Sequence, residues 1–306
     1  MDVNARTIDV GGLRTRVLEA GDSSLSGDLS SRAPVVMIHG VGGWAENWRE
    51  VMEPIAATGR RAIAVDLPGF GESEAPGRVS YFGPRDAFYP RFMRELLDAL
   101  GIAQAHIVGN SMGGAVAFMT AVTSPERTRS LSLVASGGLG SDIALFLRLV
   151  TLPGMITLAR LFGSPRQGRE VLRTCFYDAA RIPESLYRES ESYGFSSYPE
   201  FVRALRDGVT IFGVKRSLRE HWVAQASRYA GPVLVMWGRE DAVLPISHLA
   251  EAKSVYPDAE IRIIERCGHL PMVEQTEEFL GALVPFTERA ERARSEPVVA
   301  KLTSNA

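Results

Sequence analysis

From Pro34 onward, short apolar runs alternate with longer segments of helical periodicity, and this alternation leaves few folds open to the chain. Short apolar runs are typical of strands buried on both faces, and the helices between them cross from one parallel strand to the next. The sequence therefore predicts one doubly wound α/β domain. The expected strands are 35–38, 62–65, 106–108, 131–134, 233–236 and 261–264, and the expected helices are 46–57, 86–100, 112–123, 247–255 and 276–290.

Two more β-type runs open the chain. Thr7–Val10 and Leu13–Leu18 are separated by Gly11-Gly12, and two glycines between strand-like runs are typical of a tight hairpin. Residues 21–32 are almost all small or polar, which predicts a surface loop.

The regular alternation stops between residues 134 and 233. This stretch of roughly a hundred residues keeps helical periodicity but contains no strand-like run, which favours a helical lid over a structureless loop. We expect the lid to be residues 138–226, inserted after the sixth core strand, with a core of 1–137 and 227–290. The polar residues 291–306 are predicted to be a flexible tail.

Composition excludes several classes of protein. The 34 Lys and Arg residues against 36 Asp and Glu residues give a net charge of −2, so nucleic acid is not an expected partner. The apolar stretch 143–162 is broken by charges and Pro-Gly, so no stable membrane insertion is expected. Cys175 and Cys267 are too far apart for a CxxC motif and are expected to be free thiols. With no secretory signal visible, we expect a cytoplasmic protein, and the oligomeric state stays open.

The strongest motif is Gly109-Asn110-Ser111-Met112-Gly113, between a predicted strand and the predicted helix 112–123. G-x-S-x-G in this context is a nucleophile elbow, in which glycines allow a sharp backbone turn and the serine lies at a helix N-terminus. Ser111 is therefore the candidate nucleophile. The alternative is a glycine-rich packing turn.

A serine hydroxyl needs a base to activate it, and the base needs a carboxylate to orient it. His269 follows the predicted strand 261–264, and Asp241 follows the predicted strand 233–236. Both lie just past strand ends, as Ser111 does. We therefore predict a catalytic triad of Ser111, Asp241 and His269.

The remaining histidines are predicted to have structural roles. His106 opens a buried strand and is expected in the core or at its edge, whereas His221 and His248 are expected at the surface. His39 follows the first core strand and is expected to shape a loop. No cluster has metal-ligand spacing and no G-x-G-x-x-G follows a strand, so neither a metal nor another cofactor is expected.

Acyl transfer also needs an oxyanion hole. One backbone N–H should come from the residue after the nucleophile and one from the loop after the first core strand, which assigns Met112 and Val41. Losing such a donor costs on the order of 3 kcal/mol of transition-state stabilisation. The neighbouring residues predicted to contact the substrate are Asn110, Leu270, Gly40 and Gly42.

These motifs together resemble the α/β-hydrolase superfamily over about residues 5–290. The resemblance is carried by His39-Gly40, the run 66–73, the elbow, the Asp241 turn and Gly268-His269. It implies a mostly parallel sheet flanked by helices, a Ser–Asp–His chain order and an acyl-enzyme mechanism. Some members carry the acid earlier in the chain, so Asp142 is an alternative to Asp241. Asp66 and Glu72, within the run, are expected to form structural hydrogen bonds.

Three segments are similar to meta-cleavage-product hydrolases, which split a carbon–carbon bond in vinylogous 1,5-diketones. The elbow and the segments 135–140 and 176–178 carry this similarity. Those enzymes place a tryptophan after the catalytic histidine, where this chain has Leu270, and use a lid arginine for which Arg188 is an out-of-register candidate. The run 269–274 looks more like general esterases and lipases.

The predicted function is therefore a serine hydrolase that cleaves small-molecule carboxylic esters. The apolar density of the predicted lid, after ordinary packing is allowed for, favours a hydrophobic acyl or alcohol group. Carbon–carbon bond hydrolysis of meta-cleavage products is the first alternative. A non-catalytic ligand-binding protein on the same fold is the second.

Overall fold

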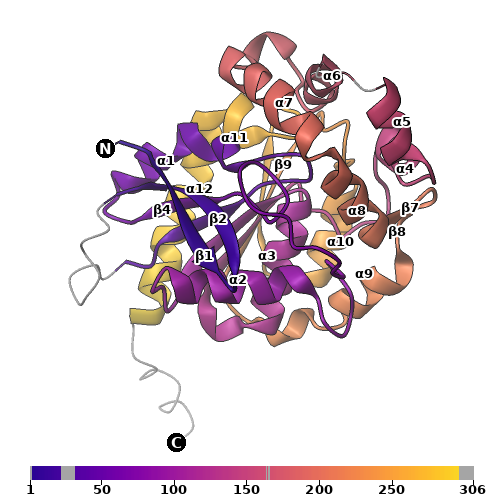
Figure 1. The fold of residues 1–306 in the computed structure, drawn as a ribbon. Coiled ribbons are helices and arrows are strands. Elements are labelled where there is room, and N and C mark those ends of the chain that lie inside the picture. Colours follow the sequence, from indigo (N-terminus) through magenta and orange to yellow (C-terminus); the bar gives the residue numbers. More distant parts are fainter. Residues whose placement is uncertain (1, 22–31, 163, 165, 296–306) are drawn as a thin grey trace, which may run out of the picture.

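The computed structural model describes residues 2–21, 32–162, 164 and 166–295, and they form a central twisted sheet with helices on both faces (Figure 1). The eight-stranded sheet has the order β1-β2-β4-β3-β5-β6-β9-β10. Only the β1–β2 and β2–β4 pairs are antiparallel. Its strands are β1 (Asn4–Val10), β2 (Leu13–Ala20), β3 (Val35–Ile38), β4 (Ala62–Val65), β5 (Ala105–Asn110), β6 (Thr128–Val134), β9 (Val233–Gly238) and β10 (Glu260–Ile264).

Helices enclose the sheet because the central strands are apolar on both sides. The helices are α1 (Arg49–Ala56), α2 (Phe88–Ala99), α3 (Met112–Thr123), α4 (Leu145–Val150), α5 (Met155–Phe162), α6 (Arg166–Thr174), α7 (Glu184–Ser196), α8 (Tyr198–Gly208), α9 (Arg216–Val223), α10 (His248–Val255), α11 (Pro271–Glu274) and α12 (Thr276–Ser295). Val36 and Ile38 of β3 belong to the apolar cluster that includes α2 and α3. The alternate residues Val35 and Met37 belong to the cluster that includes α1 and α12. Because successive side chains of a strand point to opposite faces of the sheet, β3 packs into the apolar cluster on each face.

The predicted hairpin and parallel strands are confirmed. Gly11 and Gly12 have φ of 59° and 86°. Positive φ at both central positions is what a two-residue type I′ hairpin requires, and glycine adopts it without strain. The pairing of β1 with β2 closes directly at this turn, from Val10 to Leu13.

Helices α4 to α9 lie between β6 and β9 in sequence and gather on one side of the molecule (Figure 1). We call residues 138–226 the insertion. It includes a short hairpin that the sequence did not predict, β7 (Val209–Thr210) with β8 (Gly213–Val214). Strands of two residues are too short to produce an alternating pattern, which is why sequence periodicity misses them.

Two other boundaries differ from the prediction. The helix expected from residue 46 begins as a 3₁₀ turn, Ala45–Trp48, before α1. The expected tail does not begin at residue 291, because α12 continues to Ser295. Glu291 accepts a hydrogen bond from the Ala33 N–H at 2.9 Å and pairs with Arg129 at 3.0 Å, which holds the helix end to the sheet. Of the predicted loop 21–32, residues 22–31 lie outside the described residues.

No helix among the described residues is both long and apolar enough to cross a bilayer.

Candidate active site

Ser111 occupies a sharp turn between β5 and α3. Its φ of 56° and ψ of −120° lie in a region that non-glycine residues rarely adopt. The flanking glycines make the turn possible, because a Cβ on Gly109 would lie 2.0 Å from the Gly113 carbonyl oxygen, and one on Gly113 would lie 2.2 Å from the Ile38 carbonyl oxygen. The surrounding packing thus holds the Ser111 backbone in a strained conformation, as in a nucleophile elbow.

Asp241 and His269 lie side by side although 28 positions separate them. The Nδ1 atom of His269 donates to Asp241 Oδ2 at 2.7 Å, and both side chains are buried. The other oxygen, Oδ1, accepts from the N–H groups of Val243 and Leu244 at 2.8 and 2.9 Å. A carboxylate accepts but does not donate, so the ring proton lies on Nδ1 and the lone pair of Nε2 is left for another proton.

Ser111 and His269 line one cavity. Among the described residues, no hydrogen bond joins Ser111 Oγ to the His269 ring. A contact between a serine nucleophile and its histidine commonly shortens when substrate binds. The arrangement has the three parts of a Ser–His–Asp triad, in which histidine takes the serine proton and aspartate orients the histidine ring.

The loop after β3 passes directly beside the candidate nucleophile. A Cβ on Gly40 would lie 2.9 Å from Ser111 Cβ, so only glycine allows this approach. Val41 follows in the same loop and lines the cavity. Met112 begins α3, and the first N–H groups of a helix have no acceptor within it. The structure thus brings both predicted oxyanion residues to Ser111.

His39 shapes this loop, as predicted. Its Nε2 accepts from the Leu67 N–H at 2.9 Å, which places the ring proton on Nδ1, 2.7 Å from the Gly40 carbonyl oxygen. Burial lowers the pKa of His39 to about 4, so the ring is neutral at pH 7. A neutral His39 ties the loop after β3 to the loop after β4.

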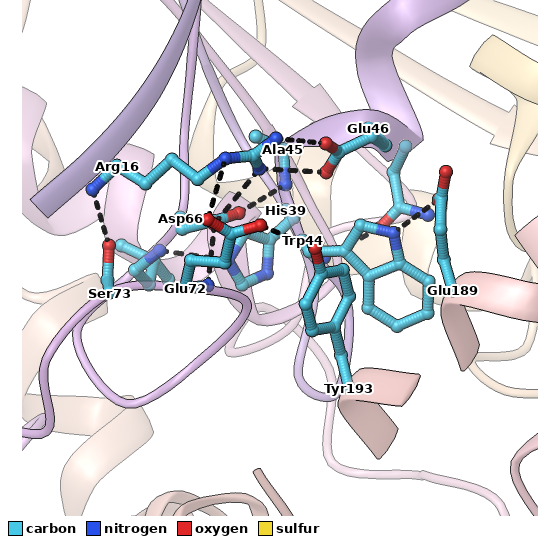
Figure 2. Close-up of polar contacts among 12 residues, drawn as sticks. Arg16, His39, Trp44, Ala45, Glu46, Asp66, Glu72, Ser73, Glu189 and Tyr193 are labelled. Carbon is cyan, nitrogen blue, oxygen red and sulfur yellow. Dashed lines mark hydrogen bonds and ion pairs between the residues drawn. The ribbon is translucent and has the colours of Figure 1, made fainter. Parts of the chain in front are cut away.

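A buried charge network supports the same loop from behind, and Figure 2 shows it. Asp66 Oδ1 accepts from the Ala45 N–H at 2.7 Å, and Oδ2 accepts from the Glu72 N–H at 3.0 Å. Arg16 reaches Asp66 at 3.3 Å and also pairs with Glu46. Burial raises the pKa of Asp66 to about 6. The predicted structural roles of Asp66 and Glu72 are confirmed.

Two side chains connect this loop region to α7 of the insertion (Figure 2). Trp44 Nε1 donates to Glu189 at 2.8 Å, and Tyr193 donates its hydroxyl proton to Glu72 at 2.8 Å. The rings of Trp44 and Tyr193 also pack together, with centroids 5.6 Å apart. The insertion is therefore fixed to the loop that carries Val41.

Two cavities adjoin Ser111 and Val41, which line both of them, and we call them lobe A and lobe B. Lobe A lies between α3 and the insertion and is almost wholly apolar; its lining includes Phe82, Met119, Leu147, Leu205 and Trp222. Lobe B has a mixed lining that includes Trp44, Asn47, Gln167, Ser190 and Phe201. A substrate that spans Ser111 would thus place one group in each lobe.

All four residues predicted to contact substrate line lobe B: Gly40, Gly42, Asn110 and Leu270. Asn110 Nδ2 donates to the carbonyl oxygens of Val134 and His269, at 3.2 and 3.0 Å. Its Oδ1 is buried with no hydrogen-bond partner among the described residues. The Asn110 amide therefore fixes the histidine loop to the elbow.

The structure does not bring two other candidate residues, Asp142 and Arg188, to the site. Asp142, the alternative acid, has a side chain that is 65% exposed and pairs with Arg148 at 3.5 Å, whereas His269 pairs with Asp241. Arg188 is exposed on α7 and lines neither lobe.

His248 is buried at 2% exposure, so its predicted surface position is wrong. The ring packs against Trp237, with centroids 5.9 Å apart, and against Gly140, where a Cβ would lie 2.2 Å from the ring. Burial lowers the pKa of His248. Helical periodicity places His248 at the start of a helix. Only the fold shows that Gly140, near the start of the insertion, covers its ring.

Most of the lining comes from the insertion, and sequence reasoning did not identify these residues individually. Tyr198 and Phe201 of α8 line lobe B, and Leu218 and Arg219 of α9 line lobe A. Their only sequence signal is the apolar density of the segment. Side chains that meet from six separate helices have no common spacing by which a sequence could reveal them.

Comparisons with known proteins agree with this geometry. The sequence model of the alpha/beta hydrolase fold family matches residues 33–276. The chain is 30% identical to a 2-hydroxy-6-oxo-6-phenylhexa-2,4-dienoate hydrolase of Burkholderia cepacia, over 85% of this chain and 89% of that protein. It is also 30% identical to a 2-hydroxy-6-oxononadienedioate/2-hydroxy-6-oxononatrienedioate hydrolase of Comamonas testosteroni, over the same shares of the two chains.

A solved structure shows the same arrangement. The 2-hydroxy-6-oxo-6-phenylhexa-2,4-dienoate hydrolase of Rhodococcus sp. strain RHA1 superposes with a TM-score of 0.73 at 26% identity, covering 94% of this chain and 99% of that one. The family model spans the strands and loops that carry Ser111, Asp241 and His269. The chain belongs to the α/β-hydrolase fold family.

Proposed function

We propose that this protein is a serine hydrolase that cleaves the carbon–carbon bond of a vinylogous 1,5-diketone of the 2-hydroxy-6-oxo-dienoate type. The observation that carries the hydrolase assignment is the Asp241–His269 hydrogen bond next to the strained Ser111. The bond type is supported by two relatives that align with most of this chain's length. Both are named as hydrolases of substrates of the 2-hydroxy-6-oxo-dienoate type. The ester hydrolysis predicted from sequence becomes the second candidate.

In the proposed reaction, the substrate first tautomerises: the enol O–H loses its proton and becomes a ketone, and the carbon next to the distant carbonyl gains a proton. Ser111 Oγ then attacks the distant carbonyl carbon while His269 Nε2 takes the serine proton. The N–H groups of Val41 and Met112 hold the oxyanion. When the carbon–carbon bond breaks, its electron pair moves into the conjugated carbonyl system, His269 gives its proton to this fragment, which leaves as a dienol, and the acyl group stays on Ser111. Water, activated by His269, releases the acyl group as a carboxylate.

The two lobes suit a substrate cut in its middle. Because Ser111 and Val41 are shared, a carbonyl carbon at Ser111 would have one fragment in each lobe. We propose that the insertion acts as a lid, because it supplies most of the lining and bonds to the loop of Val41 through Trp44. A lid would exclude bulk water during the carbon–carbon cleavage step.

Ester hydrolysis is kept as a candidate because of Leu270. This apolar residue follows His269 and lines lobe B, where meta-cleavage-product hydrolases carry tryptophan. The described lining of lobe B also holds no Lys or Arg side chain. A neutral ester needs no cation there, so the lobe accommodates an uncharged acyl or alcohol group.

The test measures kcat/KM on two substrates side by side, 2-hydroxy-6-oxo-6-phenylhexa-2,4-dienoate and p-nitrophenyl hexanoate. A faster reaction of the dienoate, abolished in Ser111→Ala, is the expected result. A dominant ester rate would replace the first candidate with the second. If folded wild-type protein turns over neither substrate and is not labelled by a fluorophosphonate, the protein is a ligand-binding member of the fold and the proposed function is wrong.

A further inference from the structure

Arg219 of α9 is the one charged Lys, Arg, Asp or Glu side chain among the described residues that line the two lobes. It lines lobe A, whose other described walls are apolar side chains, glycines and the Ser111 region. Arg219 is half-buried, so beside these apolar walls its guanidinium loses part of its hydration, and an anion or hydrogen-bond acceptors can replace the lost water. Arg219 is therefore placed to bind an anionic group in lobe A.

The protein supplies only part of the replacement for the lost water. Nη1 donates to the Leu139 carbonyl oxygen at 3.1 Å, which orients the guanidinium beside the entry to the insertion. Within the described ranges, no carboxylate forms an ion pair with Arg219. Asp142, on the same stretch of chain as Leu139, pairs with Arg148 instead. Because guanidinium has five N–H donors in a planar fork, donors are left for a further acceptor.

Neighbouring residues on α9 contrast with this arrangement. Arg216 is exposed and donates to Glu220 four residues later, an ordinary surface pair. Leu218 and Trp222 line lobe A together with Arg219, so this part of α9 faces the cavity. The charge at position 219 is thus on the cavity side of the helix, while that at 216 is on the solvent side.

We infer that Arg219 binds a carboxylate of the substrate, so that the fragment entering lobe A carries an anionic group beyond an apolar stretch. A carboxylate fits because its two oxygens match the guanidinium fork in a bidentate pair. The apolar walls between Ser111 and Arg219 would contact the carbon chain. This inference rests on the proposed function in so far as Ser111 is the nucleophile.

It also distinguishes this chain from what its resemblance implies. The lid arginine expected at Arg188 lies on the outside of α7, so it does not reach either lobe. A carboxylate-bearing substrate would instead find its cation in lobe A, on α9. Arg219 is therefore proposed as a specificity-determining residue and not as part of the proton-transfer machinery.

The experiment compares matched p-nitrophenyl esters that differ only in charge at the end of the acyl chain. The neutral member is p-nitrophenyl hexanoate, and the anionic member is the mono-p-nitrophenyl ester of hexanedioic acid, with the four- and eight-carbon half-esters to find the best length. Wild type and Arg219→Met are assayed for kcat and KM separately. Arg219→Lys keeps the charge without the fork, and Arg216→Met is the matched control.

We expect Arg219→Met to lower kcat/KM for the anionic ester by about 10- to 100-fold, mainly through KM, since that is the range for a hydrogen-bonded charge pair. The neutral ester should change by less than about threefold, because it makes no use of the charge. Arg219→Lys should fall between, and Arg216→Met should match wild type. Equal losses on both esters, or no loss on either, would overturn the inference.

A binding measurement keeps the inference testable without turnover. Ser111→Ala and Ser111→Ala/Arg219→Met are titrated calorimetrically with hexanedioate and with hexanoate. Tighter binding of hexanedioate that disappears in the double variant supports the inference even if no ester is hydrolysed. Hydrolysis that depends on Ser111 but shows no dependence on Arg219 in either assay rejects the inference and leaves the proposed function standing.

Discussion

Asp241→Asn should lower kcat by about 10⁴ while leaving the fold intact, and the hydrogen bonds of Asp241 show why. Oδ1 accepts from two backbone N–H groups, of Val243 and Leu244. An asparagine that turned its NH₂ group toward them would leave two buried donors unpaired, which costs about 2–6 kcal/mol. The amide oxygen must therefore stay on the backbone side. The NH₂ group then faces His269.

This orientation of the asparagine changes the tautomer of His269. Because the asparagine NH₂ donates, His269 Nδ1 has to accept, and the single ring proton of the neutral imidazole moves to Nε2. An Nε2 that carries a proton cannot take the proton of Ser111. The same substitution in a serine protease triad lowers kcat by about 10⁴, which corresponds to about 5 kcal/mol of transition-state stabilisation.

The assay measures kcat on p-nitrophenyl hexanoate or the dienoate, together with the midpoint of thermal unfolding. The expected result is a loss of about 10⁴ in kcat and an unfolding midpoint within about 3 °C of wild type, because both backbone hydrogen bonds remain. Asp142→Asn is the matched control and should keep full activity, since Asp142 is exposed and paired with Arg148. A loss below tenfold in Asp241→Asn, or a large loss in Asp142→Asn, would refute the assignment.

Two further substitutions probe the loop after β3. Gly40→Ala places a Cβ 2.9 Å from Ser111 Cβ and should lower kcat by about 100-fold, because it displaces the loop of Val41. Gly281→Ala is the control and should leave kcat unchanged, because the space around Gly281 is open. Equal kcat values for the two variants would contradict the close approach of Gly40 to Ser111. His39→Gln should remove a pH dependence of folding. The pKa of His39 is lowered from 6.5 to about 4 in the native protein, so the unfolded chain binds the proton first as the pH falls. The free energy of unfolding of wild type therefore decreases between pH 6.5 and pH 4. The loss relative to the variant should reach about 3 kcal/mol in urea unfolding at pH 4 against pH 7, and parallel curves would show that His39 is not buried and neutral.

The candidate triad could be predicted from sequence because each member lies in a local motif that follows a strand. β5, β6, β9 and β10 are neighbours in a parallel sheet, so the loops after them meet at one edge. Strand periodicity and chain direction alone thus bring Ser111, Asp241 and His269 together. The Asp241–His269 bond required no information from the insertion.

Contacts between distant segments could not be predicted in this way. The polar sequence predicts a tail from Glu291, yet this side chain lies 2.9 Å from His106 and accepts from the Ala33 N–H at 2.9 Å. Burial alone would raise the pKa of Glu291, but the hydrogen bonds from His106 and Ala33 and the nearby Arg129 lower it to about 2. No local pattern marks a helix end as the partner of three other segments. The same limit applies to Arg219, whose position in lobe A depends on how the fold places α9 and α3 around one cavity.

Hydrogen bonds connect the insertion to the Val41 loop, and they limit where substrate specificity can change without moving that loop. Trp44 lies three residues from Val41 and donates to Glu189, while Tyr193 donates to Glu72, whose N–H bonds to Asp66. Asp66 in turn accepts from the Ala45 N–H beside Trp44. A displacement of α7 would therefore be transmitted to the Val41 loop through these hydrogen bonds, which link it to the buried Asp66. Within the described part of the chain, the side chain of Arg219 on α9 bonds to the Leu139 carbonyl oxygen and is not part of this connection. Substrate preference can thus change at α9 without disturbing the Val41 loop, whereas changes at α7 act on substrate contacts and on that loop together.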